Sequence, residues 1–494
     1  MNAPLLLAVL SLVASSATTT SSSSGMEPKA PRAQPIQAHY DLHVSPEDSM
    51  VDVVARFSGL PDGPLVLSMS PEGSFVRLDQ PLLAGRLEAQ AGDTALDVEW
   101  TRPYGATIQT GGATEIECRW SVPQTHRELD AVRAHSDGYE WPYLDEDHGL
   151  LVTATLIFRP DKQAVDSTVR VHVPDGWSVE APWPEREPGL FVPDAGLTYD
   201  LLAVGNWERH EVELEGFRAT VLVAPGQDGL MDAVAGPIET IVKAELELFE
   251  RAPRERYLFL FGPSSLQGFA GSPKHGSMTL TVGAPAISRA DKYVPHLVAH
   301  EFFHTWAAST TRLPDELRWF NEGVTDYYAH LISARTGLTS WDEFAAQLGR
   351  AMTTVETSPL WGASSLAEAG GPRFFEGADH YHLVYSGGLV LGAWIDLALR
   401  TRHGTTLDAA MRTFLNDPRW SDRNVDPTPA DWYAVLAKLG DEELASTVAS
   451  LAEEPVEVDF VALFTDVGVP VQRTDSDAGP VYSVPASPWD RTPR

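Results

Sequence analysis

Alternation of apolar and polar side chains with a period of two dominates the chain from about residue 38 to residue 215. In the segment 51–57, VDVVARF, apolar residues recur at every second position, and turn-forming sequences such as LPDG at 60–63 separate such runs. The run 150–158 is largely apolar, which predicts a strand buried on both faces. Short strands joined by Gly- and Pro-containing turns predict a sandwich-like N-terminal β domain over residues 36–215.

The period changes to that of a helix near residue 228. Apolar residues recur at helical spacing over 230–251, and a strand-like run, MTLTV at 278–282, precedes a helix expected over 292–308. Helical patterns then predominate, and the clearest cover 341–355, 389–400, 407–415 and 429–439. We therefore expect an α+β chain of several domains, with the second over 216–340, a helical one over 341–471 and a loose polar tail over 472–494.

The first residues have the composition of a targeting segment. Residues 1–17, MNAPLLLAVLSLVASSA, contain an apolar run that is too short to span a bilayer, followed by small residues, although no Lys or Arg precedes it. This pattern predicts a signal peptide, and hence a secreted or periplasmic protein. Residues 18–35 form a Ser/Thr- and Pro-rich linker, and no other apolar run predicts a transmembrane segment.

Charge and cysteine content narrow the functional classes. The formal net charge is −33, from 69 acidic and 36 basic residues, which argues against nucleic-acid partners and anionic membrane surfaces. The single cysteine, Cys118, excludes an internal disulfide and a cysteine-based zinc cluster. It alternates with Ile116 and Trp120 on the inner face of a predicted strand, so a buried, inert thiol is expected.

The helix expected over 292–308 contains the sequence His-Glu-x-x-His, formed by His300, Glu301 and His304. Positions i and i+4 share one helix face, so the two imidazoles can bind one ion, while Glu301 lies beside it as a possible general base. A chance match on a surface helix is the alternative. The neighbouring residues are apolar, however, and burying these polar groups without partners would cost several kcal/mol, which a metal offsets.

Glu322 is the candidate third metal ligand, because it follows His304 by eighteen positions and opens a helical pattern. Asp326 lies four residues further on, on the same face, where it can accept the second N–H of a ligating histidine and fix its tautomer. His296, one turn before His300, is expected at the helix start or in support of the ligands. The prediction is one Zn²⁺ per chain, with one position left for water.

The sequences HEFFHTW and WFNEGVTDYYA resemble the glycyl aminopeptidase family of zinc metallopeptidases, which are gluzincins. The resemblance is tight over 295–329 and looser from about residue 40 to about residue 400. It implies a β-rich N-terminal domain, a thermolysin-like catalytic domain over 216–340 and a helical domain, and it places Asn321 beside the ligand Glu322. Longer family members carry a PDZ module, for which we expect no room here.

The resemblance also implies a residue that stabilises the reaction's oxyanion. Related gluzincins carry a Tyr-x-Lys-Gly element whose tyrosine donates a hydrogen bond to the tetrahedral intermediate. Aligning Gly388 with the family glycine places Tyr385 on that tyrosine, although Gly387 replaces the family lysine. A tyrosine that only packs in the core is the alternative.

In thermolysin-like folds an edge strand lies along the cleft and pairs with an extended peptide, and the strand-like run 278–282, with the Gly-containing loop before it, is the stretch expected to do so here. The candidate substrate-binding residues on this stretch are Gly271, Lys274, His275, Ser277 and Met278. Aminopeptidases of the clan hold the substrate α-ammonium with a glutamate in a pattern like Gly-Gly-x-Glu-His, and here Lys274 stands where that glutamate should be. A cation facing a cation costs one to several kcal/mol. This predicts poor aminopeptidase action, unless Pro273 turns Lys274 outwards or another carboxylate, such as Glu376 or Asp379, holds the amine.

The function that the sequence favours is a zinc-dependent metallopeptidase acting on a peptide or protein substrate. Zinc would activate a water, Glu301 would act as general base, and Tyr385 would share the oxyanion. Two alternatives remain: a peptide-binding or scaffold protein with a vestigial zinc site, and a zinc hydrolase of a non-peptide amide or epoxide. The intact Glu301 argues against the first. The oligomeric state is not predicted.

Overall fold

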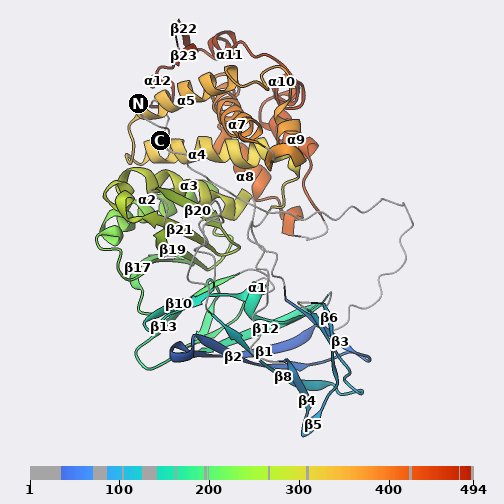
Figure 1. The fold of residues 1–494 in the computed structure, drawn as a ribbon. Helices are drawn as coiled ribbons and strands as arrows, with labels where there is room; N and C mark the ends of the chain where they lie inside the picture. Colours follow the sequence, from blue (N-terminus) through green and yellow to red (C-terminus); the bar gives the residue numbers. More distant parts are fainter. Residues whose placement is uncertain are drawn as a thin grey trace, which may run out of the picture. The chain divides into compact units, whose positions relative to one another are not determined.

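The structure is a computed structural model (Figure 1). It describes residues 35–490 except 70–85, 103–104, 125–141, 162–163, 194–196, 198–199, 265–267, 308–310, 376, 422–424 and 478. The predicted signal peptide and most of the linker therefore lie outside the described residues, as does Glu376. The chain divides into two compact units, residues 1–231 with 254–288 and residues 232–253 with 289–494. The segment 216–340 contributes to both.

An eight-stranded sheet forms the first layer of the first unit, with strand order β14-β15-β12-β1-β2-β8-β4-β5. Only the pair β1 and β12 is parallel, and the other described pairs are antiparallel. The strands are β14 (Glu185–Glu187), β15 (Leu190–Phe191), β12 (Val165–His172), β1 (Ile36–Ser45), β2 (Met50–Ser58), β8 (Glu115–Pro123), β4 (Glu88–Ala91) and β5 (Thr94–Ala95).

Two four-stranded sheets complete the β-rich part, with orders β13-β16-β10-β9 and β11-β3-β7-β6. One buried apolar cluster draws on all three sheets, as in a sandwich. The strands of the two smaller sheets are β13 (Ser178–Glu180), β16 (Leu201–Gly205), β10 (His148–Val152), β9 (Tyr143–Leu144), β11 (Arg159–Pro160), β3 (Leu65–Ser68), β7 (Gly105–Ile108) and β6 (Val98–Arg102).

In the β-rich part, the structure confirms the expectation for Cys118 and corrects the one for the run 150–158. Cys118 is buried on β8, and burial raises the pKa of its thiol to about 12, as expected of an inert cysteine. The expected buried strand over 150–158 is wrong in its second half, where β10 gives way to a buried helical turn, α1 (Thr153–Leu156). A run that is apolar on every side carries no period, so the sequence cannot distinguish a buried strand from a buried helical turn.

The first unit also contains a five-stranded mixed sheet of order β17-β18-β19-β21-β20. Strands β18, β19 and β21 are parallel, and β20 closes the edge as the antiparallel partner of β21. The strands are β17 (Glu208–Leu214), β18 (Phe217–Val223), β19 (Arg256–Ser264), β20 (Phe269–Pro273) and β21 (Ser277–Gly283). The edge strand is therefore β20. The expectation that the run 278–282 lies at the edge is wrong, because this run belongs to β21, which pairs with β19 on one side and with β20 on the other.

The second unit is helical and is built around α7 (Ala378–Ala398), a largely buried helix that contacts α4, α5 and α6 (Figure 1). The other helices of eight or more residues are α2 (Leu230–Phe249), α3 (Ala290–Ala307), α4 (Thr325–Arg335), α5 (Trp341–Glu356), α8 (Leu407–Leu415), α9 (Pro429–Leu439) and α10 (Glu442–Glu453). Shorter elements are η3 (Ala284–Arg289), η4 (Asp315–Leu317), η5 (Trp319–Val324), α6 (Leu366–Ala369), η6 (Pro372–Phe375), η7 (Leu399–His403), η8 (Pro418–Ser421), α11 (Phe460–Asp466) and α12 (Ser487–Asp490). An N-terminal β-rich region followed by a helical region confirms the expected α+β class.

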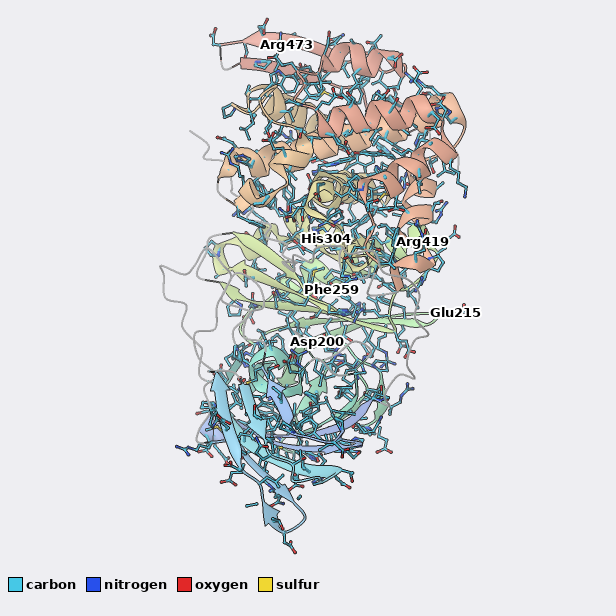
Figure 2. All side chains as sticks on the ribbon, turned by 90° about the vertical axis from the view of Figure 1, so that its right-hand side faces the viewer. Asp200, Glu215, Phe259, His304, Arg419 and Arg473 are labelled. Carbon is cyan, nitrogen blue, oxygen red and sulfur yellow. The ribbon has the colours of Figure 1, made fainter. Side chains whose placement is uncertain are left out.

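Two features of the helical unit differ from expectation. Residues 378–403 form a helix long and apolar enough to cross a membrane, but 89% of its most apolar window is buried, as in a core helix. The segment predicted as a loose tail contains a hairpin of β22 (Gln472–Ser476) and β23 (Gly479–Ser483). Arg473, labelled in Figure 2, pairs with Glu356 of α5 at 2.7 Å, and Trp489 is fully buried. A few side chains thus anchor a segment whose composition is polar.

Candidate active site

Helix α3 carries the three residues of the His-Glu-x-x-His motif, and Figure 2 labels one of them, His304. His300, Glu301 and His304 are all exposed by 1% or less. Their neighbours on the helix, including Phe302 and Phe303, are equally buried. The motif therefore lies inside the helical unit, which excludes the alternative of a chance match on a surface helix.

Glu322 lies on η5, a π-helical turn that leads directly into α4. Single π-helical turns within helices are frequent at functional sites. Behind this turn, Gly323 packs against α7: a Cβ atom on Gly323 would lie 2.7 Å from the carbonyl oxygen of Val384, and one on Gly388 would lie 2.8 Å from the Gly323 Cα atom. The two glycines let α7 approach the segment that carries Glu322.

The three predicted metal ligands converge on one point. The Nε2 atoms of His300 and His304 are 3.2 Å apart, and they lie 3.5 Å and 3.7 Å from Oε2 of Glu322. A tetrahedral zinc ion with ligand bonds of about 2.0–2.1 Å separates its ligand atoms by about 3.3 Å. The donor set and its spacing therefore fit Zn²⁺.

The charge balance of the site also suits a cation. Burial alone would raise the pKa of Glu322, but the two histidines hold it well below its ordinary value. Burial lowers the pKa of His300, but the contacts with Asp326 and Glu322 outweigh burial and raise it to about 10. The surrounding carboxylates thus favour positive charge at the nitrogen atoms that would bind the metal.

Polar neighbours orient the ligand side chains. The Nδ2 group of Asn321 donates to Oε1 of Glu322 at 3.0 Å, which leaves Oε2 directed at the histidines. Oδ1 of Asp326 lies 3.6 Å from Nδ1 of His300, on the side of the ring away from the site. His296 holds the same Oδ1 atom at 3.0 Å, so it supports the ligands from inside α3 rather than starting the helix. At 3.6 Å the Asp326 carboxylate lies beyond hydrogen-bond distance of Nδ1 of His300, and its negative charge favours a proton on that atom, which leaves Nε2 for the metal.

Tyr385 of α7 completes the cluster. Its hydroxyl donates to Oε2 of Glu322 at 2.6 Å, and its ring stacks on that of His300 with centroids 5.7 Å apart. Burial, and then the charge of Glu322, raise the pKa of Tyr385 well above its ordinary value. The phenol therefore remains a hydrogen-bond donor at neutral pH, placed at the edge of the donor triangle.

The predicted substrate-binding residues belong to the first unit. Gly271 lies on the edge strand β20, and Ser277 and Met278 open β21. Lys274 and His275 form the connection between these strands: the backbone N–H of Lys274 donates to the Ser277 carbonyl at 2.6 Å, and Nδ1 of His275 lies 2.8 Å from Nη2 of Arg254. Of the alternative amine-holding carboxylates, Asp379 is exposed in the first turn of α7. His380 and His382 also lie on α7.

The sequence analysis missed Glu245, a buried glutamate on α2. Its side chain is 0% exposed, and neither carboxylate oxygen has a hydrogen-bond partner among the described residues. Burial raises its pKa well above the ordinary value, against a smaller lowering by His300. The spacing of Glu245 from Ile241 and Phe249, both buried, places it on the apolar helix face, a signal the sequence already contains.

We expect Glu245→Gln to stabilise the metal-free protein increasingly as pH rises above about 4. The folded-state pKa is raised above the unfolded value of about 4.3, so the folded state keeps a proton that the unfolded state loses, and wild-type stability falls through this window. The amide of the variant cannot ionise, so its free energy of unfolding does not fall in this way as pH rises. Thermal unfolding in excess chelator should show almost no Tm gain at about pH 4 and a gain that grows steadily towards about pH 8.

The exposed Glu247 on the same helix provides the control, because Glu247→Gln should leave the pH profile of Tm unchanged. An equal gain from Glu245→Gln at both pH values would contradict the assignment of a raised pKa.

Part of this site is similar in sequence to a known family. Residues 294–381 match the sequence profile of the M61 glycyl aminopeptidases, a span that contains both zinc-ligand motifs and ends before Tyr385. No curated protein matches the chain in sequence. The match confirms the resemblance that the sequence motifs indicate.

Solved structures share the fold. An aminopeptidase N family protein from Idiomarina loihiensis aligns with a TM-score of 0.72 at 18% identity, covering 90% of this chain and 80% of its own. An M1 zinc metallopeptidase from Deinococcus radiodurans aligns with a TM-score of 0.52 at 15% identity, covering 87% and 95%. A mutant of an M1 zinc metallopeptidase from the same organism, bound to a Tyr-Ser-Ala substrate, aligns with a TM-score of 0.50 at 16% identity, covering 85% and 94%. These likenesses show the architecture.

The class follows from the sequence match over residues 294–381, and the solved structures agree with it in fold. The chain is a zinc metallopeptidase. In this metallopeptidase the π-helical turn and the Gly323–Gly388 approach bring Glu322 and Tyr385 to the two histidines.

Proposed function

We propose that this metallopeptidase hydrolyses peptide bonds, with Glu301 as general base and Tyr385 as the donor to the oxyanion. The observation that carries the proposal is the donor triangle, whose atoms are 3.2–3.7 Å apart, with Tyr385 hydrogen-bonded at its edge. When bound, zinc supplies a Lewis acid and lowers the pKa of water towards neutrality. His300, His304 and Glu322 would hold it.

Glu301 would carry out the proton transfer. It follows His300 on α3 and is buried, as is His304 one turn further on. It would take the proton of the attacking water and pass it to the nitrogen of the leaving amine. The hydroxyl of Tyr385 would exchange its bond to Glu322 for one to the oxygen of the substrate carbonyl as negative charge develops there. A vestigial site would not need either group.

We further propose that internal peptide bonds are favoured over the N-terminal one. The proposal rests on the resemblance, which aligns Lys274 with the glutamate that holds the α-ammonium in related aminopeptidases. Lys274 is buried, so its charge is less screened by water than that of a surface lysine. The tripeptide bound to the Deinococcus enzyme supports a peptide as the substrate class here.

A mixed peptide library, supplied with free and with acetylated N-termini, tests both statements. We expect cleavage of both sets at rates within about threefold of each other, because a lysine stands at position 274 where related aminopeptidases have the glutamate that holds the amine. The variant Lys274→Glu should shift the preference towards the free amine. A large wild-type advantage for free N-termini would contradict the preference for internal bonds. Hydrolysis of amides or epoxides without any peptide cleavage would contradict the proposed reaction.

We also propose export from the cytoplasm, on the pattern of residues 1–17. N-terminal sequencing of the protein recovered outside the cytoplasm should find cleavage after the small residues near position 17, and an intact Met1 would contradict it.

A further inference from the structure

A strip of four aromatic rings leads from the catalytic cluster to the surface of the helical unit. The ring of Tyr385 stacks on that of Tyr381 with centroids 4.2 Å apart. Tyr381 lies 5.7 Å from Phe374, and Phe374 lies 4.9 Å from Phe375. Phe375 is 49% exposed, although large apolar side chains are usually buried. The strip therefore ends in a ring that is open to the solvent.

The exposed end of the strip is held from one side by Arg318. The guanidinium carbon lies 4.8 Å from the ring centroid of Phe374 and 5.2 Å from that of Phe375. The same guanidinium donates to the carbonyl oxygens of Gly370 and Gly371 and pairs with Asp315, which fixes the segment before η6. Phe375 is thus exposed on a turn that the contacts of Arg318 hold in place.

The buried end of the strip adjoins the reacting groups. Tyr385 reaches Glu322 with its hydroxyl at 2.6 Å. Tyr381 stacks directly on Tyr385, so this second ring is one ring removed from the same carboxylate. A peptide side chain that lies along these rings would therefore belong to a residue close to the bond being cleaved.

We propose that Tyr381, Phe374 and Phe375 form a binding subsite for a large apolar, preferably aromatic, side chain of the peptide substrate. This inference rests on the proposed function and names its substrate class. Aromatic rings offer a flat apolar surface on which another ring stacks, and an exposed ring gains most from being covered. Continuity with Tyr385 favours a substrate side chain over a separate protein partner.

The test compares acetylated peptides of Gly, Ala and Ser that carry a single Phe, Leu or Ala at one position, with cleavage sites read by mass spectrometry. The wild-type enzyme should cleave next to Phe with kcat/KM about 10–50 times that for Ala. Phe375→Ser should lower kcat/KM for the Phe peptide about tenfold and leave the Ala peptide within about twofold. The separate variant Phe375→Trp should keep the wild-type preference for the Phe peptide, because an aromatic ring remains at this position.

Val481→Ser on β23 provides the matched control, because Val481 has the same exposure of 49% and lies outside the strip. Zinc content and oligomeric state are measured for every variant. Wild-type cleavage without preference for Phe would contradict the subsite but not the proposed function. So would a Phe375→Ser variant in which kcat/KM falls equally for the Phe and the Ala peptide. A change of oligomeric state in Phe375→Ser with the preference intact would assign the ring to a second copy of the chain and would also overturn it. Absence of all peptide cleavage would instead overturn the proposed function.

Discussion

Glu301→Gln is expected to retain zinc and fold while losing roughly 10³–10⁴-fold in kcat. The amide is nearly the same size as the carboxylate, but it cannot accept the proton of the attacking water. Because Glu301 is not among the three groups that form the donor triangle, the metal affinity should change little. Steady-state kinetics on a peptide cleaved by the wild type, together with metal analysis of the same sample, check both parts of the prediction.

The control for this variant is Glu247→Gln, which makes the same chemical change at an exposed position of the helical unit and should keep wild-type kcat. Turnover of Glu301→Gln close to that of the wild type would exclude Glu301 as the base. If zinc is lost together with activity, Glu301 contributes to binding of the metal, and the assignment of roles on α3 is wrong.

His304→Ala is expected to remove the metal and with it all measurable peptidase activity. The side chain supplies one of three ligand atoms, so the remaining His300 and Glu322 would leave an ion with two protein ligands. Wild-type protein should contain about one zinc per chain after growth in zinc-replete medium, and the variant almost none. A chelator should inactivate the wild type, and added zinc should reactivate it.

The Tm of thermal unfolding shows whether the zinc site serves catalysis only or also stabilises the fold. Binding of metal to the folded state raises Tm, so His304→Ala should unfold near the Tm of the chelated wild type and not far below it. His39→Ala, which removes an exposed histidine of β1, should keep zinc and activity. Full zinc occupancy in His304→Ala would refute the ligand assignment.

The sequence by itself determined the parts of the site that lie within one turn of helix. His300 and His304 share a face because their spacing is one helical turn, and Glu301 stands beside them whatever the rest of the chain does. Asp326 follows Glu322 by the same step, so their common face was also readable. The period-2 pattern likewise predicted the N-terminal strands, because one face of each is buried.

Only the tertiary structure decided which distant segments meet. Glu322 reaches the histidines through a π-helical turn, a local geometry that the apolar period does not encode. Tyr385 is 63 residues from Glu322, and its place follows from the absence of side chains at Gly323 and Gly388, where two helices touch. The contact depends on both surfaces at once, so neither segment predicts it alone.

The aromatic strip and the C-terminal hairpin also depend on contacts between segments that are distant in sequence. Phe375 and Arg318 are distant in sequence. The ring is held in its exposed position by the guanidinium of Arg318, which also donates to the carbonyl oxygens of Gly370 and Gly371. In the hairpin, Arg473 pairs with Glu356 of α5, so a strand pair forms where composition alone indicated a loose tail. Periodicity reports which side of a segment is buried, whereas the partner that buries it is set by packing along the whole chain.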